Sequence, residues 1–388
     1  MNWDDIIIDA SATDTGMRRQ NNQDSHTAVR APNRETWRQR GHLFMVADGM
    51  GAHAVGELAS KMACDLIPHG YMKAKTGTAG EAISKSFRDV SRLINGRAAV
   101  NRDFQGMGTT CSALLLLPEG ALLAHVGDSR IYRVRDGRID QLSFDHSLVW
   151  ELIRRNHLTA DQAKVSIPKN VITRSLGPEA DIQVDLEGPL AVRPGDVFLL
   201  CSDGLSGPVT DPELGAFAEN FHPSDACRYL LQLANLRGGL DNITVQIVRI
   251  GPWVDPDSGE TANHDPSSKA NAEANGRART SWKDRILDRF TGPKPLQPLS
   301  ADEENHYRSC ECAIDEKLVR TLIKLVEEVR EAAISQAWPI DWTALSNHRK
   351  KLADARESQN ARVALREIGE LICLLGKAGR FHRKSPVS

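Results

Sequence analysis

The sequence predicts an α+β domain with a largely antiparallel β-sheet at residues 1–250, followed by a linker and an all-helical unit at residues 301–388. Two observations predict the first domain. Short apolar runs are separated by Pro-Glu-Gly, Gly-Asp-Ser and Asp-Gly, which are typical of hairpins rather than of crossover helices. Between these runs lie segments whose apolar residues recur at helical spacing, so helices and strands share one domain.

Length and composition narrow the class of protein. A chain of 388 residues exceeds the usual size of one domain, and 49 basic against 51 acidic residues give no support for a nucleic-acid or membrane-surface binder. The 7 cysteines are an odd number and lie mostly in apolar runs, as in a reduced cytosolic protein. No signal peptide is indicated, and no run approaches the roughly 18 apolar residues of a spanning helix. We therefore expect a cytoplasmic protein without a membrane span.

The elements of the first domain follow in order. Apolar runs predict strands at residues 6–8, 43–48, 109–117, 121–126, 130–135, 197–201 and 243–250. Helical spacing predicts helices at residues 56–72, 79–98, 147–157, 211–220 and 223–236. The polar stretch from Asp14 to Asp24 is dense in groups that can hold a phosphate or a metal. Residues 158–174 are polar and broken by Pro168, and we expect a mobile flap there.

The second half of the chain has a different composition. Residues 251–300 are rich in Pro, Asp, Ser, Asn, Gly and Ala, which is typical of a disordered linker. Within it, residues 282–290 fit either a short amphipathic docking turn or a solvated patch. In residues 301–388 apolar stripes predict three helices, of which the first ends before Pro339. We expect this unit to bind a partner, to restrain the first domain or to self-associate, and the linker to let it swing.

The most informative stretch is the apolar run that begins at Leu43 and ends at Asp48, followed at once by Gly49. A carboxylate at the end of a buried strand is costly without a partner. That partner could be a backbone N–H, a basic side chain or a cation. The same pattern, an apolar run ending in Asp203 and Gly204, occurs again later in the chain.

Five aspartates occupy such positions at strand ends or in Gly-rich turns: Asp24, Asp48, Asp128, Asp203 and Asp241. If they met at one edge of a sheet they would repel one another unless cations lay between them. Oxygen ligands favour Mg²⁺ or Mn²⁺. Two such ions, roughly 3.5–4 Å apart, can generate a hydroxide and stabilise an in-line displacement at phosphorus. Arg19 offers a planar fork for a phosphoryl group.

These residues belong to an ordered series of motifs. The series comprises Gly16-x-x-Arg19-x-x-Asn22-Gln23-Asp24, Val46-Ala47-Asp48-Gly49-Met50-Gly51, Gly56-Glu57-x-Ala59-Ser60, Met107-Gly108-Thr109-Thr110, Val126-Gly127-Asp128-Ser129-Arg130, Asp145-His146-Ser147, Thr173-Arg174-Ser175-Leu176-Gly177, Ser202-Asp203-Gly204-Leu205 and Asp241-Asn242-Ile243-Thr244. In this series residues 8–250 resemble the metal-dependent protein serine/threonine phosphatases of the PPM or type 2C family, in their compact bacterial form. The resemblance implies a four-layer sandwich of two antiparallel sheets flanked by helices, with the metals at one end.

The resemblance also implies roles for individual residues. Asp48 would bridge two core metals, Asp203 and Asp241 would bind the first, and the Gly49 carbonyl would bind the second. Asp24 would act on the second metal through water, and Arg19 would hold the substrate phosphate. Asp128, with Asp203, matches the position of a third, weaker metal. Residues 147–174 correspond to the flap thought to influence substrate choice. The residues that carry catalysis would be Arg19, Asp48, Asp203 and Asp241.

Some positions depart from the family pattern. Gln23 stands where many members have glutamate, so metal binding could be weaker. Met50 stands where eukaryotic members place a histidine, so a metal-bound water could protonate the leaving group. His53 and His146 are alternative proton donors, although neither occupies a chemical position of the family motifs and a structural role is favoured for both.

The sequence therefore predicts a Mg²⁺- or Mn²⁺-dependent phosphatase whose metal-bound hydroxide attacks phosphoserine or phosphothreonine in proteins. We expect it to oppose a bacterial serine/threonine kinase. Two alternatives stay open. One is a catalytically weak regulatory module that signals through its C-terminal helices. The other is an enzyme that acts on a small phosphate ester or nucleotide.

Overall fold

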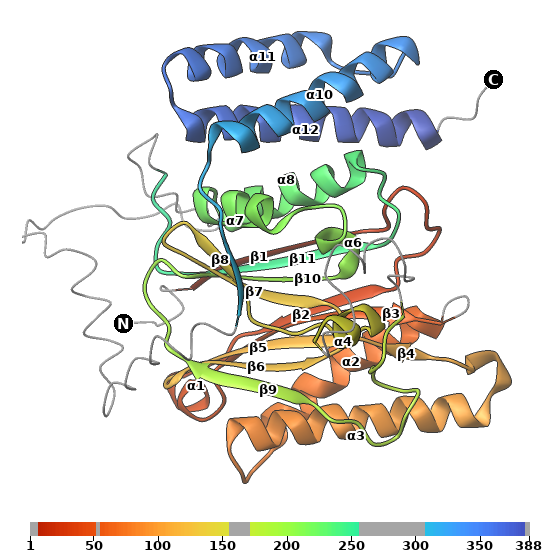
Figure 1. Ribbon diagram of the computed structural model, residues 1–388. Coiled ribbons are helices and arrows are strands. Elements are labelled where there is room, and N and C mark those ends of the chain that lie inside the picture. The colour runs from red at the N-terminus through yellow and green to blue at the C-terminus, as the bar shows by residue number, and fades with distance from the viewer. Residues whose placement is uncertain (1–6, 52–54, 155–170, 256–306, 385–388) are drawn as a thin grey trace, which may run out of the picture.

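Two antiparallel sheets packed face to face form the centre of the molecule (Figure 1). The structure is a computed structural model that describes residues 7–51, 55–154, 171–255 and 307–384. Helices cover the outer face of each sheet, so the predicted α+β sandwich is confirmed. No helix in these described ranges is long and apolar enough to cross a bilayer.

The first sheet carries the chain's N-terminal strand and its C-terminal one. Its strands, in spatial order, are β1 (Ile7–Asp14), β11 (Ile243–Ile250), β10 (Val197–Cys201), β7 (Arg130–Arg135), β8 (Arg138–Gln141) and β12 (Arg308–Glu311). The helices on its outer side are α6 (Asp203–Ser206), α7 (Asp211–Asn220) and α8 (Pro223–Leu236).

The second sheet lies below the first in Figure 1. Its strands, in order, are β2 (Asp24–Val29), β3 (His42–Met50), β5 (Cys111–Leu117), β6 (Gly120–Val126) and β9 (Asp185–Leu190), and β4 (Gly108–Thr109) pairs with the end of β3. Two long helices, α2 (Val55–Lys73) and α3 (Ala79–Val100), cover it. Shorter elements are α1 (Arg34–Arg40), η2 (Arg102–Phe104) and α4 (Leu148–Arg154).

Side chains alternate along the strands, which divides the apolar core into two parts and sets the direction of the Asp48 side chain. On β3, Leu43 and Met45 pack toward the helices, whereas Phe44 and Val46 belong to the core between the sheets, which also contains Phe198 from β10. Because strand side chains alternate, Asp48 continues the face of Phe44 and Val46. The carboxyl group therefore points into the space between the two sheets, at the end of the strand.

Several elements were not predicted from the sequence. The strands β2, β8 and β9 and the helix α1 were missed, because their sequences are polar or short and carry no clear apolar period. The predicted helix at 147–157 is present as α4. Most of the predicted flap (155–170), His53 and most of the predicted linker (256–306) lie outside the described residues.

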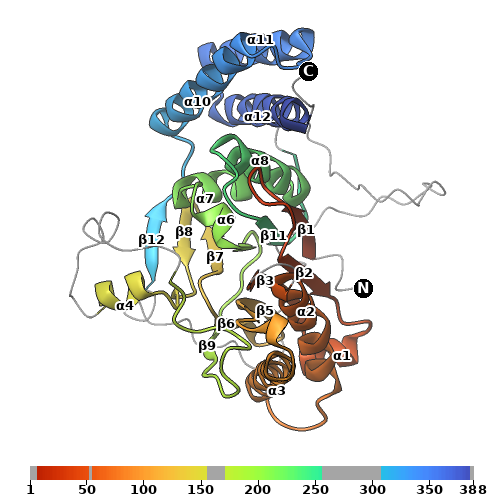
Figure 2. The ribbon, with the colours of Figure 1, turned by 90° about the vertical axis from the view of Figure 1, so that its right-hand side faces the viewer.

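The C-terminal helices form a further layer on top of α8, as Figures 1 and 2 both show. They are α10 (Glu316–Ser335), α11 (Trp342–Glu357) and α12 (Ala361–Lys384), which match the three predicted helices. No sequence pattern had predicted β12, which precedes them and pairs with β8 in the first sheet.

Close contact between α12 and α8 holds this layer in place. A Cβ on Gly369 of α12 would lie 2.8 Å from the Tyr229 ring of α8, so only glycine permits this approach. Beside it, the Arg228 guanidinium donates two hydrogen bonds to Glu370 (3.0 and 2.7 Å), and the Tyr229 hydroxyl donates another (2.6 Å). The apolar core above the first sheet continues without a break into α10, α11 and α12. In this structure the C-terminal helices are packed against the β-sandwich, which differs from the expectation of a swinging unit.

This packing leads to a stability prediction. Ile372 of α12 is fully buried in the core that α12 shares with α8, whereas Ile334 at the end of α10 is 53% exposed. We expect Ile372→Ala to lower the free energy of unfolding by about 2–5 kcal/mol in a urea titration, since it leaves a cavity. The control Ile334→Ala should change it by less than about 0.5 kcal/mol. Equal effects of the two substitutions would contradict a cooperatively packed C-terminal layer.

Candidate metal centre

The five predicted aspartates come together where strands of both sheets end. Asp24 and Asp48 face each other across the β2–β3 pair. Asp203 opens α6 directly after β10, and Asp241 lies just before β11. Asp128 follows β6. Charges on the other four all act on Asp48, which shows that the group shares one site.

Burial and mutual repulsion raise the pKa values of four of these carboxyl groups. Burial, with repulsion from Asp203 and Asp241, raises the pKa of Asp24 to about 7, against the hydrogen bond from Ser202. Burial, with repulsion chiefly from Asp203, raises the pKa of Asp128 to about 7. The pKa of Asp48 is raised well above its usual value and that of Asp203 is also raised, in each case first by burial and then by neighbouring carboxylates. Without a counter-charge the fold would favour protonated aspartates here.

The glycines after Asp48 and Asp203 allow the chain segments to approach this closely. A Cβ on Gly49 would lie 2.0 Å from the Gly56 carbonyl oxygen at the start of α2, and one on Gly204 would lie 1.8 Å from the carbonyl oxygen of Asn242. Any larger residue would push these backbones apart. The Asp-Gly pairs therefore serve close packing of the turns that carry the carboxylates, in addition to any role of the Gly49 carbonyl.

Arg19 lies at the exposed rim of the site, on the loop between β1 and β2. Its guanidinium donates a hydrogen bond to Asp241 (2.8 Å), and half of its side chain is open to solvent. Asn242 fixes this loop: its side chain accepts from the Gln23 N–H (2.8 Å) and donates to the carbonyls of Thr15 and Asn21 (3.0 and 2.9 Å). The loop therefore holds the positive charge of Arg19 beside the carboxylates.

Three residues whose roles the sequence did not reveal hold the aspartates and the Arg19 loop in position. The Ser202 hydroxyl donates to Asp24 (2.7 Å), and the Thr110 hydroxyl accepts the N–H of Asp48 (2.9 Å). Asn242 holds the Arg19 loop, as described above. All three belong to the motifs noted in the sequence, and the signal that could have found them is a small polar residue beside an aspartate or at the end of an apolar strand.

His146 takes part in holding the turn that carries Asp128. Its Nδ1 accepts the N–H of Gly127 (3.0 Å), and its Nε2 lies 2.9 Å from Asp185, which also accepts from Arg174 (3.0 Å). These contacts occupy both ring nitrogens and describe a structural position. The second histidine weighed as a proton donor, His53, lies outside the described residues.

The donor set fits a hard divalent cation. Asp24 Oδ1 and Asp128 Oδ1 are buried without a hydrogen-bond partner, which is costly unless another group serves them. Among the described residues no three His, Cys, Asp or Glu side chains are arranged to hold one ion directly. Mg²⁺ and similar ions retain several waters as ligands, so carboxylates that lie too far apart to hold an ion by themselves can hold one together with water.

The two-sheet sandwich and the aspartate cluster together define the class of a metal-dependent phosphatase. Comparisons with known proteins agree with this class. The family profile described as "Protein phosphatase 2C" matches residues 17–236, more than half of the chain. The chain therefore belongs to the protein phosphatase 2C family. The match ends before β11, and α10, α11 and α12 lie beyond it.

Named relatives are bacterial protein phosphatases. The protein phosphatase PhpP of Streptococcus pneumoniae is 36% identical over 242 residues, which cover 61% of this chain and 94% of PhpP. The structure of a serine/threonine phosphatase from Streptococcus agalactiae is similar with a TM-score of 0.58 and 33% identity, covering 63% of this chain and 99% of that one. The catalytic domain of the phosphatase PstP, in complex with two manganese ions, is similar with a TM-score of 0.54 and 31% identity over 63% of this chain and 99% of that one.

The raised pKa values predict how pH and metal affect stability. In metal-free protein the folded state holds protons on Asp24 and Asp128 up to about pH 7, while the unfolded chain releases them near pH 4. The free energy of unfolding should therefore fall as pH rises from about 4 to 7. Saturating Mn²⁺ should raise Tm more at pH 7.5 than at pH 5, because protons compete with the ion. We would measure Tm by differential scanning fluorimetry with Mn²⁺ and with EDTA. An equal Mn²⁺ effect at both pH values would count against a site built from these carboxylates.

Proposed function

We propose that this chain hydrolyses phosphoserine and phosphothreonine in proteins at a centre that holds two Mg²⁺ or Mn²⁺ ions. The observation that carries the proposal is the convergence of Asp24, Asp48, Asp128, Asp203 and Asp241. The pKa values of the first four are raised, and two buried carboxylate oxygens of the group have no hydrogen-bond partner. Family membership, the names of the relatives and the two manganese ions of the PstP complex support it.

Each residue has a proposed role. Asp48, between the sheets, would hold both ions, with Asp203 and Asp241 on one and the Gly49 carbonyl on the other. Asp24 would act through water, and Asp128 with Asp203 would hold a third ion. When bound, the ions supply a water of lowered pKa as nucleophile and neutralise charge on the phosphoryl group. Arg19 would bind the substrate phosphate, for which its exposed position at the rim leaves room.

A covalent route through cysteine has no support in the site. The cysteine nearest the aspartates in sequence, Cys201, is fully buried, and burial raises the pKa of its thiol to about 12. A thiol with such a pKa is protonated at neutral pH and is a poor nucleophile. Direct attack by water is therefore the proposed chemistry.

Three further proposals concern the opposing kinase, the cellular location and the C-terminal helices. A phosphatase of this kind would oppose a serine/threonine kinase. The 7 cysteines form no disulfides, which supports a cytoplasmic location. We also propose that the C-terminal helices influence the phosphatase, since Arg380 of α12 is ion-paired with Asp14, at the start of the Arg19 loop. Binding of a protein partner and self-association are alternative roles for the same helices.

The test is phosphate release from a phosphothreonine peptide by the full chain, with Mn²⁺ titrated in and EDTA as control. We expect turnover that rises with Mn²⁺, disappears in EDTA and falls more than about 100-fold in Asp203→Asn, a larger loss than removal of a supporting residue causes. A folded, fully active Asp203→Asn protein would refute the site.

The same assay distinguishes the alternative functions. Absence of turnover at every Mn²⁺ concentration, with the protein folded, would favour a regulatory module. Faster turnover of small phosphate esters or nucleotides than of phosphopeptides would favour the second alternative.

Arg19 is tested separately. We expect Arg19→Ala to lower kcat/KM for the phosphopeptide about 100-fold, with Arg19→Lys intermediate, since lysine keeps the charge but loses the planar fork. The neighbouring Arg18 is exposed and serves as the matched control. A similar loss in Arg18→Ala would mean that the loop contributes only general positive charge.

A further inference from the structure

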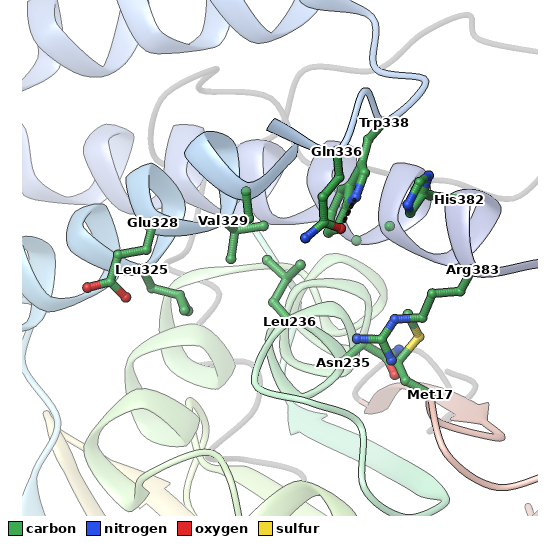
Figure 3. Close-up of a pocket in the computed structure, with 13 residues that line it drawn as sticks. Met17, Asn235, Leu236, Leu325, Glu328, Val329, Gln336, Trp338, His382 and Arg383 are labelled. Carbon is green, nitrogen blue, oxygen red and sulfur yellow. Dashed lines mark hydrogen bonds between the residues drawn. The ribbon is translucent and has the colours of Figure 1, made fainter. Parts of the chain in front are cut away.

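A cavity of about 410 Å³ lies where the C-terminal layer meets the Arg19 loop (Figure 3). Its walls come from the end of α8, from α10, from α12 and from Met17, which precedes Arg19 by two residues. The volume is within the range of small-molecule sites. Because the family match ends at residue 236, most of this wall lies outside the shared domain.

The cavity contains a polar group that lacks a partner. Asn235, at the end of α8, is only 4% exposed, and both its Oδ1 and its Nδ2 are without a hydrogen bond. A buried amide with neither atom satisfied costs free energy, so it indicates a missing ligand or water. On the same side of the cavity the side chain of Arg383 extends from α12 toward Asn235 and Met17 (Figure 3). Among the described residues Arg383 has no ion-pair partner.

The remaining lining includes polar side chains, Gln336, His382 and Glu328, of which Glu328 lies beside Leu325 and away from Arg383 (Figure 3). The other lining side chains are apolar and include an aromatic ring. Leu236 projects into the cavity and Val329 faces it from α10 (Figure 3). The indole of Trp338 lies across from them and is stacked with His382 at 5.9 Å between ring centroids. Arg383 and the Asn235 amide lie at one end, the apolar walls and the indole lie next to them, and the Glu328 carboxylate lies at the opposite end. This order complements a molecule whose carboxylate head lies at Arg383 and whose flat apolar body lies against the indole.

The cavity wall is linked to the candidate active site through the loop backbone. The Met17 N–H donates to the Gly239 carbonyl (2.7 Å), and Arg19 on the same loop donates to Asp241 (2.8 Å). Asp14 anchors the start of the loop by accepting from the Gly16 N–H (2.8 Å) and from Arg380. A molecule seated against Met17 would therefore contact the segment that positions Arg19.

We propose that this cavity is an effector site for a small organic carboxylate with an apolar, aromatic body, and that its occupancy alters how the Arg19 loop engages substrate. The binding part stands on the cavity itself, whereas the coupling part rests on the proposed function. Arg383 would hold the carboxylate with help from the Asn235 amide, and Trp338 with the aliphatic walls would enclose the body.

Binding is tested by calorimetry on the full chain in EDTA, so that it does not depend on turnover. The probe is indole-3-acetate, with tryptamine (the same ring with an amine) and acetate (the head alone) as matched compounds. We expect binding of indole-3-acetate only, weakened at least about tenfold by Arg383→Gln and by Asn235→Leu. Arg102→Gln is the control, since Arg102 is exposed and follows α3 on the far side of the molecule. Arg383→Gln changes an exposed residue, so it tests the site even if Asn235→Leu does not fold.

Other outcomes would overturn the proposal. Equal binding of tryptamine, no binding of indole-3-acetate at millimolar concentration, or a crystal structure with only an ordered water on Asn235 would each refute the site.

Coupling is tested with the phosphopeptide assay, where we expect indole-3-acetate to change KM about fivefold with kcat nearly constant. Binding without any change in KM would refute the coupling alone. Absence of turnover would refute the proposed function and leave the binding result standing.

Discussion

Repulsion among buried carboxylates is the constraint on which the rest of this structure depends. Asp48 lies near the end of β3, between the two sheets, and four other aspartates act on it from strand ends and turns around it. In a site of low polarity such a cluster is costly unless it is protonated or neutralised by cations. The sandwich supplies the cluster by bringing the ends of strands from both sheets to one place, and the chemistry of the family depends on what then neutralises it.

The surrounding residues keep this unfavourable arrangement in position. Glycines at Gly49 and Gly204 let the turns approach to distances that no other residue would permit. Ser202, Thr110 and Asn242 fix the carboxylates and the Arg19 loop through hydrogen bonds. Because rigid strands and hydrogen-bonded turns hold the site, the carboxylates that we propose as metal ligands are already arranged in the structure without an ion.

The sequence predicted the site best at positions where only one physical reason explains the residue type found there. An aspartate that ends an apolar strand, as at Asp48 and Asp203, is conspicuous because burial makes it costly. Ser202 and Thr110 were not recognised because small polar residues have many uses. The polar strands β2 and β9 were missed for lack of an apolar period. The apolar stripe on α12 indicated helix packing, but a stripe does not say which surface it covers, and here that surface is α8.

The C-terminal part of the chain adds structure beyond the shared family domain. Strand β12 joins one sheet, and α12 reaches the start of the Arg19 loop. The central claim is nevertheless the metal centre. Its most direct test is anomalous diffraction at the manganese edge from crystals soaked in Mn²⁺. We expect two peaks about 3.5–4 Å apart beside Asp48, and we expect both to be lost in Asp48→Asn. No peak near Asp48 in crystals of an active protein would contradict it.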